Sequence, residues 1–331
     1  MSLDNSQETP KLEGIAQVPT PANALNNNMV VNVNSLASAI KSAMEANDIK
    51  AAKVVYGLPG PSVFTKRIKT TKMKAEEFRE NLSFEAATYI PHDISSVFLD
   101  FQILSSNQSE MDVLLVAIKN EILISFKEAI EAAGLEPAVA DVDYFAMSNM
   151  HEFNYPEDSN KLIALLDIGS RFTGVNLVQN KLPCFTGDIP VGGRLYTDAL
   201  CESLSITPVQ AEQIKSGAHI DGVDSALLAD TLDRTTDYVA AEIHRQLGFF
   251  WTAAELKEGI EKIYFCGGAA RSPGLLEEVK NRTGIECEII NPFKKLAWNQ
   301  NIDIDFLQQV SPVVGVSIGL AMRKLGDKVN A

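Results

Sequence analysis

An apolar run that ends in an aspartate and turns straight back is the feature that most limits how this chain can fold. The segment LIALLDIGSRFTG reads as a buried strand that ends at Asp167, followed by a tight turn at Gly169 and Ser170. Thr173 begins the return strand. Because glycine has no side chain, backbone N–H groups at such a turn can approach a phosphate closely. The hydroxyl groups of Ser170 and Thr173 can add donors, and Asp167 can hold Mg²⁺ through a bound water molecule. Taken alone, a plain β-hairpin with a polar tip also explains the segment.

Two glycine pairs stand at the ends of apolar stretches downstream. In IYFCGGAARSPGL, a buried strand ends at Gly267 and Gly268, which with Ala269 allow a flat adenosine group to lie against the backbone. A tight strand-to-helix turn that needs glycine for packing is the alternative. In DIPVGGRLYTDAL, Gly192 and Gly193 stand just before a predicted helix, whose free N–H groups favour an anion.

A charged pair follows on the next predicted helix. Glu212 and Lys215 lie three residues apart in AEQIKSG, on one face of that helix. In this position they can grip the ribose hydroxyls and the base of a nucleotide. A solvated ion pair is the alternative, and it is the commoner role for charges at this spacing.

The overall composition narrows the possible partners. The chain has 331 residues, enough for two domains at about 150 residues each, and 46% of them are hydrophobic. Its net charge of -14 argues against nucleic-acid binding, which needs a basic face. An anionic membrane surface would repel it, so we expect membrane association only through a protein partner. The four cysteines form no CxxC pair and the four histidines are scattered, so we expect reduced thiols and no metal centre.

Hydrophobic patterns divide the chain into unequal parts. Residues 1–10 are polar and predict a flexible start. Residues 62–118 read as a strand, a helix and two strands joined by a polar hairpin turn. The polar loop at 151–160 is the predicted domain boundary, and after it come three strands, several helices, and then alternating strands and helices. This order predicts a mixed α/β fold instead of repeated parallel βαβ units.

The order and spacing of these motifs together are more specific than any one of them taken alone. A DxGS hairpin, a GG pair before a helix, an AExxK helix and a GG pair after a strand occur together, with one strand and one helix behind them. In this the chain resembles the PilM family of actin-like type IV pilus assembly proteins and, more distantly, the cell-division protein FtsA. Other PilM-like segments are GLPGPSVFTKRI, EAATYIPHDISSVFLDFQIL, AGLEPAVADVD and GVSIGLAMRKLG. The resemblance extends from about residue 11 to 326.

The resemblance implies an α/β fold of the actin-like (ribonuclease H-like) type, with two lobes around a nucleotide cleft and a small inserted α+β subdomain. Residues 11–61 and 140–158 would form the first lobe, together with a C-terminal helix over 312–326. The insertion would span 62–139, and the second lobe 159–311.

The resemblance also implies a function. The chain would be a cytoplasmic scaffold at the inner face of the inner membrane, in pilus biogenesis and twitching motility. It would bind the N-terminal cytoplasmic tail of an inner-membrane protein that is PilN-like. ATP or ADP with Mg²⁺ would serve as a structural or switching ligand, with hydrolysis slow at most, because Asp167 is the only carboxylate placed near a γ-phosphate. The alternatives are an FtsA-like filament protein, a small-molecule kinase of the same superfamily, and an assembly protein of type II secretion.

One departure from the family pattern concerns the first half. Actin-like folds arose by duplication, so each half should open with a D-x-G-[ST] hairpin, and the first half contains no such motif. In PilM-like chains a hairpin of the form LDIGSS lies just before the position of KLEGIAQVP (11–19). The sequence therefore looks truncated at its start. We expect the first sheet to lack its opening strands, the first phosphate loop to be absent, and nucleotide binding to be weakened.

Overall fold

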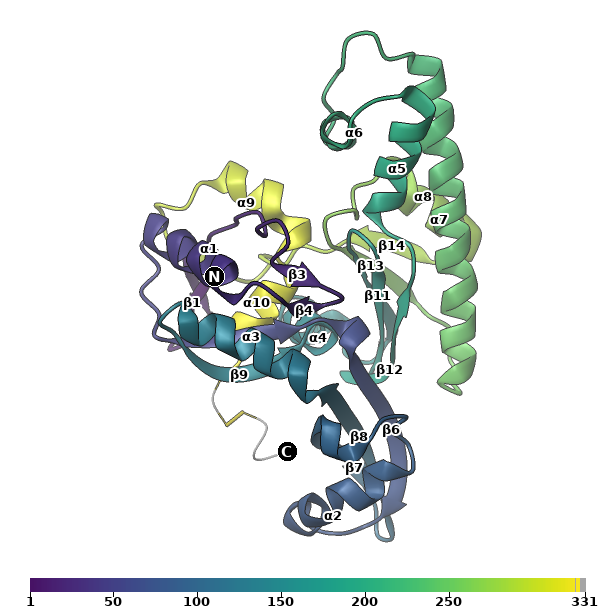
Figure 1. The fold of residues 1–331 in the computed structure, drawn as a ribbon. Coiled ribbons are helices and arrows are strands. Elements are labelled where there is room, and N and C mark those ends of the chain that lie inside the picture. The colour runs from purple at the N-terminus through teal and green to yellow at the C-terminus, as the bar shows by residue number, and fades with distance from the viewer. Residues whose placement is uncertain (325, 328–331) are drawn as a thin grey trace. The chain divides into compact units, whose positions relative to one another are not determined.

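The computed structural model describes residues 1–324, 326 and 327 (Figure 1). These residues form two compact units. Unit 1 contains residues 1–150, 295–304 and the described residues from 316 onward, and unit 2 contains 151–294 and 305–315. The chain first passes from unit 1 to unit 2 between Met150 and His151, inside helix α4 (Asp143–Asn154). The sequence predicts a polar loop at this point, but the helix continues through the first residues of that stretch.

The first sheet of unit 1 begins with one short strand, at residues that the sequence predicts to be flexible. Strand β1 (Ser2–Asp4) pairs antiparallel with β2 (Lys11–Gly14), and β15 (Ala297–Trp298) adds to β2 in parallel. The prediction of a flexible start at 1–10 is therefore wrong for residues 2–4. Within the described residues no second strand and no D-x-G-[ST] turn precedes β2, and β5 (Lys53–Leu58) pairs with β9 (Glu136–Val142) in a separate two-stranded sheet, so the expected pair of opening strands is missing. In the loop between β1 and β2, the Ser6 N–H donates to the Asp4 carboxylate at 2.9 Å.

The rest of the first lobe is built from short elements. Strands β3 (Leu25–Asn26) and β4 (Met29–Val30) form a hairpin, and α1 (Val33–Ala46) follows. Asn32 caps α1 by accepting a hydrogen bond from the Ser35 N–H. Strand β5 (Lys53–Leu58) pairs in parallel with β9 (Glu136–Val142) in a two-stranded sheet.

The inserted subdomain has the predicted order of elements. It contains β6 (Val63–Thr71), α2 (Ala75–Ala87), β7 (Val97–Ser106) and β8 (Glu110–Lys119), with short 3-10 turns at Gly60–Ser62 and Ile94–Ser96. The strands form an antiparallel sheet in the order β6-β8-β7, which places β7 at an edge. The buried face of α2 packs on this sheet, and helix α3 (Asn120–Ala132) leads back to β9.

Unit 2 is organised around one mixed five-stranded sheet. Its strands are β10 (Leu162–Ile168), β11 (Thr173–Gln179), β12 (Leu182–Ile189), β13 (Lys262–Cys266) and β14 (Glu286–Ile289), and their order is β12-β11-β10-β13-β14. The first three form an antiparallel meander, whereas β13 and β14 run parallel to β10. The prediction of a mixed α/β fold is confirmed.

Helices cover this sheet and complete both units. They are α5 (Gly193–Leu204), α6 (Pro208–Lys215), α7 (Ser225–Ala253), α8 (Leu275–Thr283), α9 (Ile304–Val310) and α10 (Gly315–Ala321), with 3-10 turns at Pro156–Asp158 and Ser311–Val313. The predicted helix over 312–326 is thus shorter than expected. Within the described residues, no single helix is long and apolar enough to span a membrane; only the segments Ile304–Val313 and Gly315–Ala321, bent by 96°, meet the length and composition criteria together.

Candidate functional site

The turn between β10 and β11 forms the centre of the candidate site in unit 2. The Gly169 N–H donates to the Phe172 carbonyl oxygen at 3.0 Å, which closes the tight turn that the sequence predicts. Ser170 lies exposed at the tip of the turn. Thr173 is fully buried, and its hydroxyl donates to the Val191 carbonyl oxygen at 2.9 Å. We therefore do not retain Thr173 as a phosphate contact, because its hydroxyl anchors the hairpin to the segment before α5.

The start of α5 is joined to this turn through backbone hydrogen bonds. The Gly193 N–H donates to Gly169 O at 2.9 Å, and the Arg194 N–H donates to Ser170 O at 2.8 Å. A Cβ added at Gly192 would lie 2.6 Å from both carbonyl oxygens, so only glycine fits here. The sequence predicts free N–H groups at the start of this helix, but two of them are already engaged, and an anion would have to use other donors.

The end of β13 lies against the end of β10. The Ala269 N–H donates to Ile168 O at 2.9 Å, and Gly267 has a φ of 93°. A Cβ added at Gly267 would overlap the Asp167 carboxylate and the Ile168 carbonyl oxygen. The glycine therefore leaves room for the Asp167 carboxylate at the point where both strands end.

Asp167 has an unusual protonation equilibrium. Burial raises the pKa of its carboxyl to about 6, well above the ordinary range of a carboxyl group. Among the described residues, no group of three or more His, Cys, Asp or Glu side chains could hold a metal ion. Any Mg²⁺ at Asp167 would thus be held by this carboxylate, by water and by the ligand's own oxygens.

Glu212 and Lys215 form one polar cluster with the start of α5. Lys215 Nζ donates to Gly193 O at 2.9 Å, to Thr197 Oγ1 at 3.0 Å and to Glu212 Oε1 at 2.9 Å. The Lys215 side chain is only 16% exposed, whereas that of Glu212 is 58% exposed. Burial opposes ionisation of Glu212, but the Thr197 hydroxyl and the Lys215 ammonium outweigh it, so the pKa of this carboxyl lies below its ordinary range. Glu212 is therefore the member of the pair that can reach a ligand.

The structure brings the predicted site residues together from four segments. A Cβ added at Gly193 would lie 3.0 Å from Ala269 Cβ, 3.4 Å from Lys215 Nζ and 3.8 Å from Gly169 O. The segments that meet here are distant in sequence but adjacent in unit 2. The predicted residues that lie in this region are Asp167, Gly169, Ser170, Gly192, Gly193, Glu212, Lys215, Gly267, Gly268 and Ala269.

The cluster around Lys215 can be tested without a ligand. Replacing Lys215 by Met keeps the apolar stem but leaves Gly193 O, Thr197 and Glu212 without their shared donor. We expect the free energy of unfolding to fall by about 1–3 kcal/mol, because partly buried acceptors lose their partner. Urea denaturation would measure the loss, with the exposed Lys257→Met as the matched control. Equal midpoints for the two variants would contradict this role.

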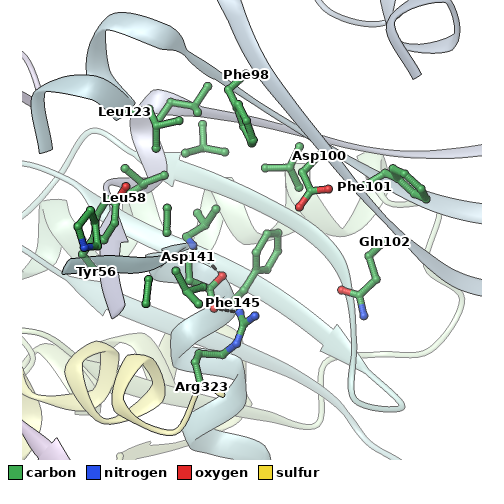
Figure 2. A pocket seen from close by; sticks show the side chains of 18 of the residues that line it. Tyr56, Leu58, Phe98, Asp100, Phe101, Gln102, Leu123, Asp141, Phe145 and Arg323 are labelled. Atoms are coloured by element: carbon green, nitrogen blue, oxygen red, sulfur yellow. Dashed lines mark hydrogen bonds and ion pairs between the residues drawn. The ribbon is translucent and has the colours of Figure 1, made fainter. Parts of the chain in front are cut away.

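A second candidate site is a groove in unit 1 with a volume of about 440 Å³. All the residues of β9 from Pro137 to Val142 line it, together with residues of β7 and β8. Figure 2 shows Phe98 and Leu123 on one side of the groove and Phe145 with Arg323 on the other. The surface is mostly apolar, with few charged groups, which is typical of sites that bind ligands or peptides.

An ion pair forms part of the lining of this groove. The Arg323 guanidinium binds the Asp141 carboxylate and also forms two hydrogen bonds, of 2.6 and 2.7 Å, with Asp327. The side chains of Arg323 and Asp141 are only 8% and 3% exposed. Sequence analysis missed this pair, because Asp141 and Arg323 are far apart along the chain.

The fold and the candidate site define the class of this protein. A mixed sheet with a DxGS hairpin, and glycine turns from several segments gathered at its strand ends, is the arrangement of the actin-like fold. Solved structures agree: the ethanolamine utilization protein EutJ from Carboxydothermus hydrogenoformans has 14% identity and a TM-score of 0.53, covering 90% of this chain and 77% of EutJ. Structures of MreB5 from Spiroplasma citri bound to ADP and to AMPPNP each have 12% identity and a TM-score of 0.50, covering 92% of this chain and 78% of theirs.

Sequence comparison identifies the family. The family described as type IV pilus assembly protein PilM matches residues 1–325. The chain therefore belongs to this family. The structure of a PilM-PilN type IV pilus biogenesis complex is also similar, with 27% identity, a TM-score of 0.86, and coverage of 97% of this chain and 94% of that one. The family match favours pilus assembly over the cell-division and small-molecule kinase alternatives.

Proposed function

We propose that this protein is a nucleotide-binding scaffold of type IV pilus assembly, and that its unit 1 groove binds the N-terminal cytoplasmic tail of a PilN-like inner-membrane protein. The observation that carries the proposal is the groove itself, together with the likeness to a chain from a PilM-PilN complex. The scaffold would act in the cytoplasm, at the inner face of the inner membrane, and would reach the membrane only through this partner.

The backbone around the groove favours an extended peptide as the ligand. Strand β9 belongs to a two-stranded sheet with β5, and β7 is an edge strand of the inserted sheet. Consecutive residues of β9 line the groove, so the strand presents its backbone as well as alternate side chains. An extended segment can pair with such an edge while its side chains fill the apolar pocket. This arrangement suits the short tail of a membrane protein better than a folded domain.

The tail-binding proposal is tested by filling the groove. Ala140 lies in β9, is exposed and lines the groove, so Ala140→Trp should occupy the space of the peptide without disturbing buried packing. We expect the affinity for a synthetic peptide with the amino-terminal tail of the PilN-like protein to fall by at least tenfold, which is about 1.4 kcal/mol. Isothermal titration calorimetry would measure the loss.

Two controls make this test specific. Ala132→Trp places the same side chain at an exposed position of α3 outside the groove lining, and it should leave the affinity unchanged. A variant that lacks residues 62–118 should also lose the tail while unit 2 stays folded. If Ala140→Trp binds the peptide as tightly as the unmodified chain, the tail site lies elsewhere.

We also propose that unit 2 binds ATP or ADP with Mg²⁺ at the gathered glycine turns. Ser170 and Gly169 would face the phosphates, the turn at Gly268 would lie against the adenosine, and Asp167 would hold Mg²⁺ through a bound water molecule. Glu212 would accept hydrogen bonds from the ribose, with Lys215 holding that carboxylate in place. The close approach of Gly193 to Ala269 and Lys215 supports this assignment, because it brings the glycine turns next to the polar pair. Hydrolysis would be slow at most, since a single positioned carboxylate supplies little of what phosphoryl transfer requires.

A further inference from the structure

The longest helix of the protein carries an unusual row of exposed side chains. Helix α7 has 29 residues and runs along the outer side of unit 2 beside α5 and α8 (Figure 1). Leu227, Tyr238 and Phe249 on it are 39%, 57% and 62% exposed. These three side chains are spaced by eleven residues, which is close to three helical turns, so they lie on one line along the helix.

Two arginines lie on the same line, between the apolar side chains. The side chains of Arg234 and Arg245 are 71% and 66% exposed. Each forms an ion pair with an acidic residue of the preceding turn: Arg234 with Asp230, and Arg245 with Glu242. The buried residues of α7, among them Val239, Ile243 and Leu247, lie on the opposite side and pack in the core of unit 2. Singly exposed apolar side chains are ordinary on a protein surface. A line of alternating apolar and arginine side chains opposite the buried face instead has the composition of a binding surface.

We propose that this row, consisting of Leu227, Arg234, Tyr238, Arg245 and Phe249, is the interface between two copies of this chain, with the two α7 helices packed antiparallel about a twofold axis at Tyr238. The positions of its members carry the proposal. In an antiparallel pair centred on Tyr238, residues equally far before and after it lie opposite each other. Leu227 then packs against Phe249 of the other copy. Tyr238 packs against Tyr238 of the other copy.

The charges of α7 are complementary in the same arrangement. Arg234 lies opposite Glu242 of the other copy, and Arg245 lies within one residue of the position opposite Asp230. The twofold axis repeats each pair, so four arginine–carboxylate contacts flank the central tyrosines. A parallel pair would bring Arg234 against Arg234 and Arg245 against Arg245, which is repulsive. The surface is therefore self-complementary in one orientation only.

The expected result is a dimer that forms at micromolar to tens of micromolar concentration. Sedimentation velocity should show the average mass rising from the monomer value of 36.1 kDa toward twice that value as concentration increases. The double variant Tyr238→Glu, Phe249→Glu should remain monomeric over the same range. Both side chains are exposed, so its melting temperature should match that of the unmodified chain, which separates a lost interface from a lost fold.

Cysteine cross-linking tests the orientation. Tyr238→Cys should form a disulfide-linked dimer under mild oxidation, because facing residues on the axis come within the short Cα separation that a disulfide requires. Asp233→Cys, exposed on another side of α7, is the control, and the unmodified chain gives the background from its native cysteines. A mixture of Leu227→Cys and Phe249→Cys proteins should yield mainly mixed dimers. Dimers of Leu227→Cys with itself would contradict the antiparallel arrangement, and a chain that stays monomeric at 100 µM with no Tyr238→Cys product above the control would overturn the proposal.

Discussion

Gly319→Ala should destabilise unit 1 by about 3 kcal/mol or more. Gly319 lies in α10 where this helix crosses α4, and a Cβ added there would overlap the carbonyl oxygen of Ala146. That oxygen belongs to the backbone of α4, so it cannot swing aside as the end of a side chain would. The two helices would have to separate, and the fully buried Ile318 and Met150 would lose their packing. A loss of this size is a large part of the roughly 5–15 kcal/mol that holds a typical domain together.

Urea unfolding followed by tryptophan fluorescence would measure this effect unit by unit. Trp298 lies in unit 1 and Trp251 in unit 2, so replacing Trp251 by Phe leaves a reporter of unit 1 alone. Gly248→Ala, in α7 of unit 2, is the control for an added methyl group, because a Cβ there has nothing within 4 Å; Trp298→Phe leaves Trp251 to report on its unit. Alanine favours helices by up to about 1 kcal/mol over glycine, so the control should be unchanged or more stable. An unfolding midpoint for Gly319→Ala equal to that of the unmodified chain would show that the helix crossing tolerates a methyl group.

The sequence predicts the architecture of unit 2 well because each of its elements carries a local signal. The strands at 162–168 and 262–266 are apolar runs that end at glycine turns, and the hairpin after the first has its glycine at the tip. The inserted subdomain was also predictable, since its strands and helix are separated by polar turns. In these regions local propensity and burial agree, so the pattern alone is enough.

The short first strand of unit 1 was not predictable in the same way. Strand β1 has only three residues, and its turn contains no glycine. The turn is held by the Asp4 carboxylate, which accepts the Ser6 N–H, and by Asn5, whose side chain donates to Ala321 O at 2.9 Å. That last contact joins residues from opposite ends of the chain. Local pattern therefore gives no sign of a strand at residues 2–4, although β1 pairs with β2.

The sequence predicts which residues meet at the candidate site, but it does not predict which groups each of them bonds to. The glycine motifs indicate which segments meet, whereas the partner of each polar group depends on tertiary packing. Thr173 reads as a phosphate donor, yet its hydroxyl is used by Val191, and Lys215 reads as a ligand contact, yet it is bonded to three protein groups. The pairing of Asp141 with Arg323 in the groove has no local signal at all.

Asp167→Asn should make the protein more stable at neutral pH while it weakens Mg²⁺-dependent nucleotide binding. Burial raises the pKa of Asp167 to about 6, above the value of about 3.9 for an unfolded aspartate. The folded state therefore holds the proton more tightly than the unfolded state, and the charged carboxylate opposes folding. This cost is absent below about pH 4, grows as pH rises toward 6, and is complete above it, where it reaches up to about 3 kcal/mol at 1.36 kcal/mol per pKa unit.

Measuring unfolding at two pH values separates the cost of the charged Asp167 carboxylate from changes in packing. Asparagine has nearly the same shape but no charge, so the variant should gain up to about 3 kcal/mol at pH 7.5 and almost nothing at pH 4. Trp298→Phe leaves Trp251 as the reporter of unit 2, and Asp221→Asn, at a fully exposed position of the same unit, is the control. A gain that is equal at both pH values would come from something other than the carboxylate charge.

The same variant tests why the chain keeps a carboxylate that destabilises it. If Asp167 holds Mg²⁺ through water, titration of ATP should show a large loss of affinity in the presence of Mg²⁺ and a much smaller change without the metal. A stabilised fold with weakened Mg-nucleotide binding is the combination expected when a partly buried carboxylate is retained for a ligand. Equal affinity losses with and without Mg²⁺ would remove the metal from this explanation, and Asp167 would then act by shaping the turn against Gly267.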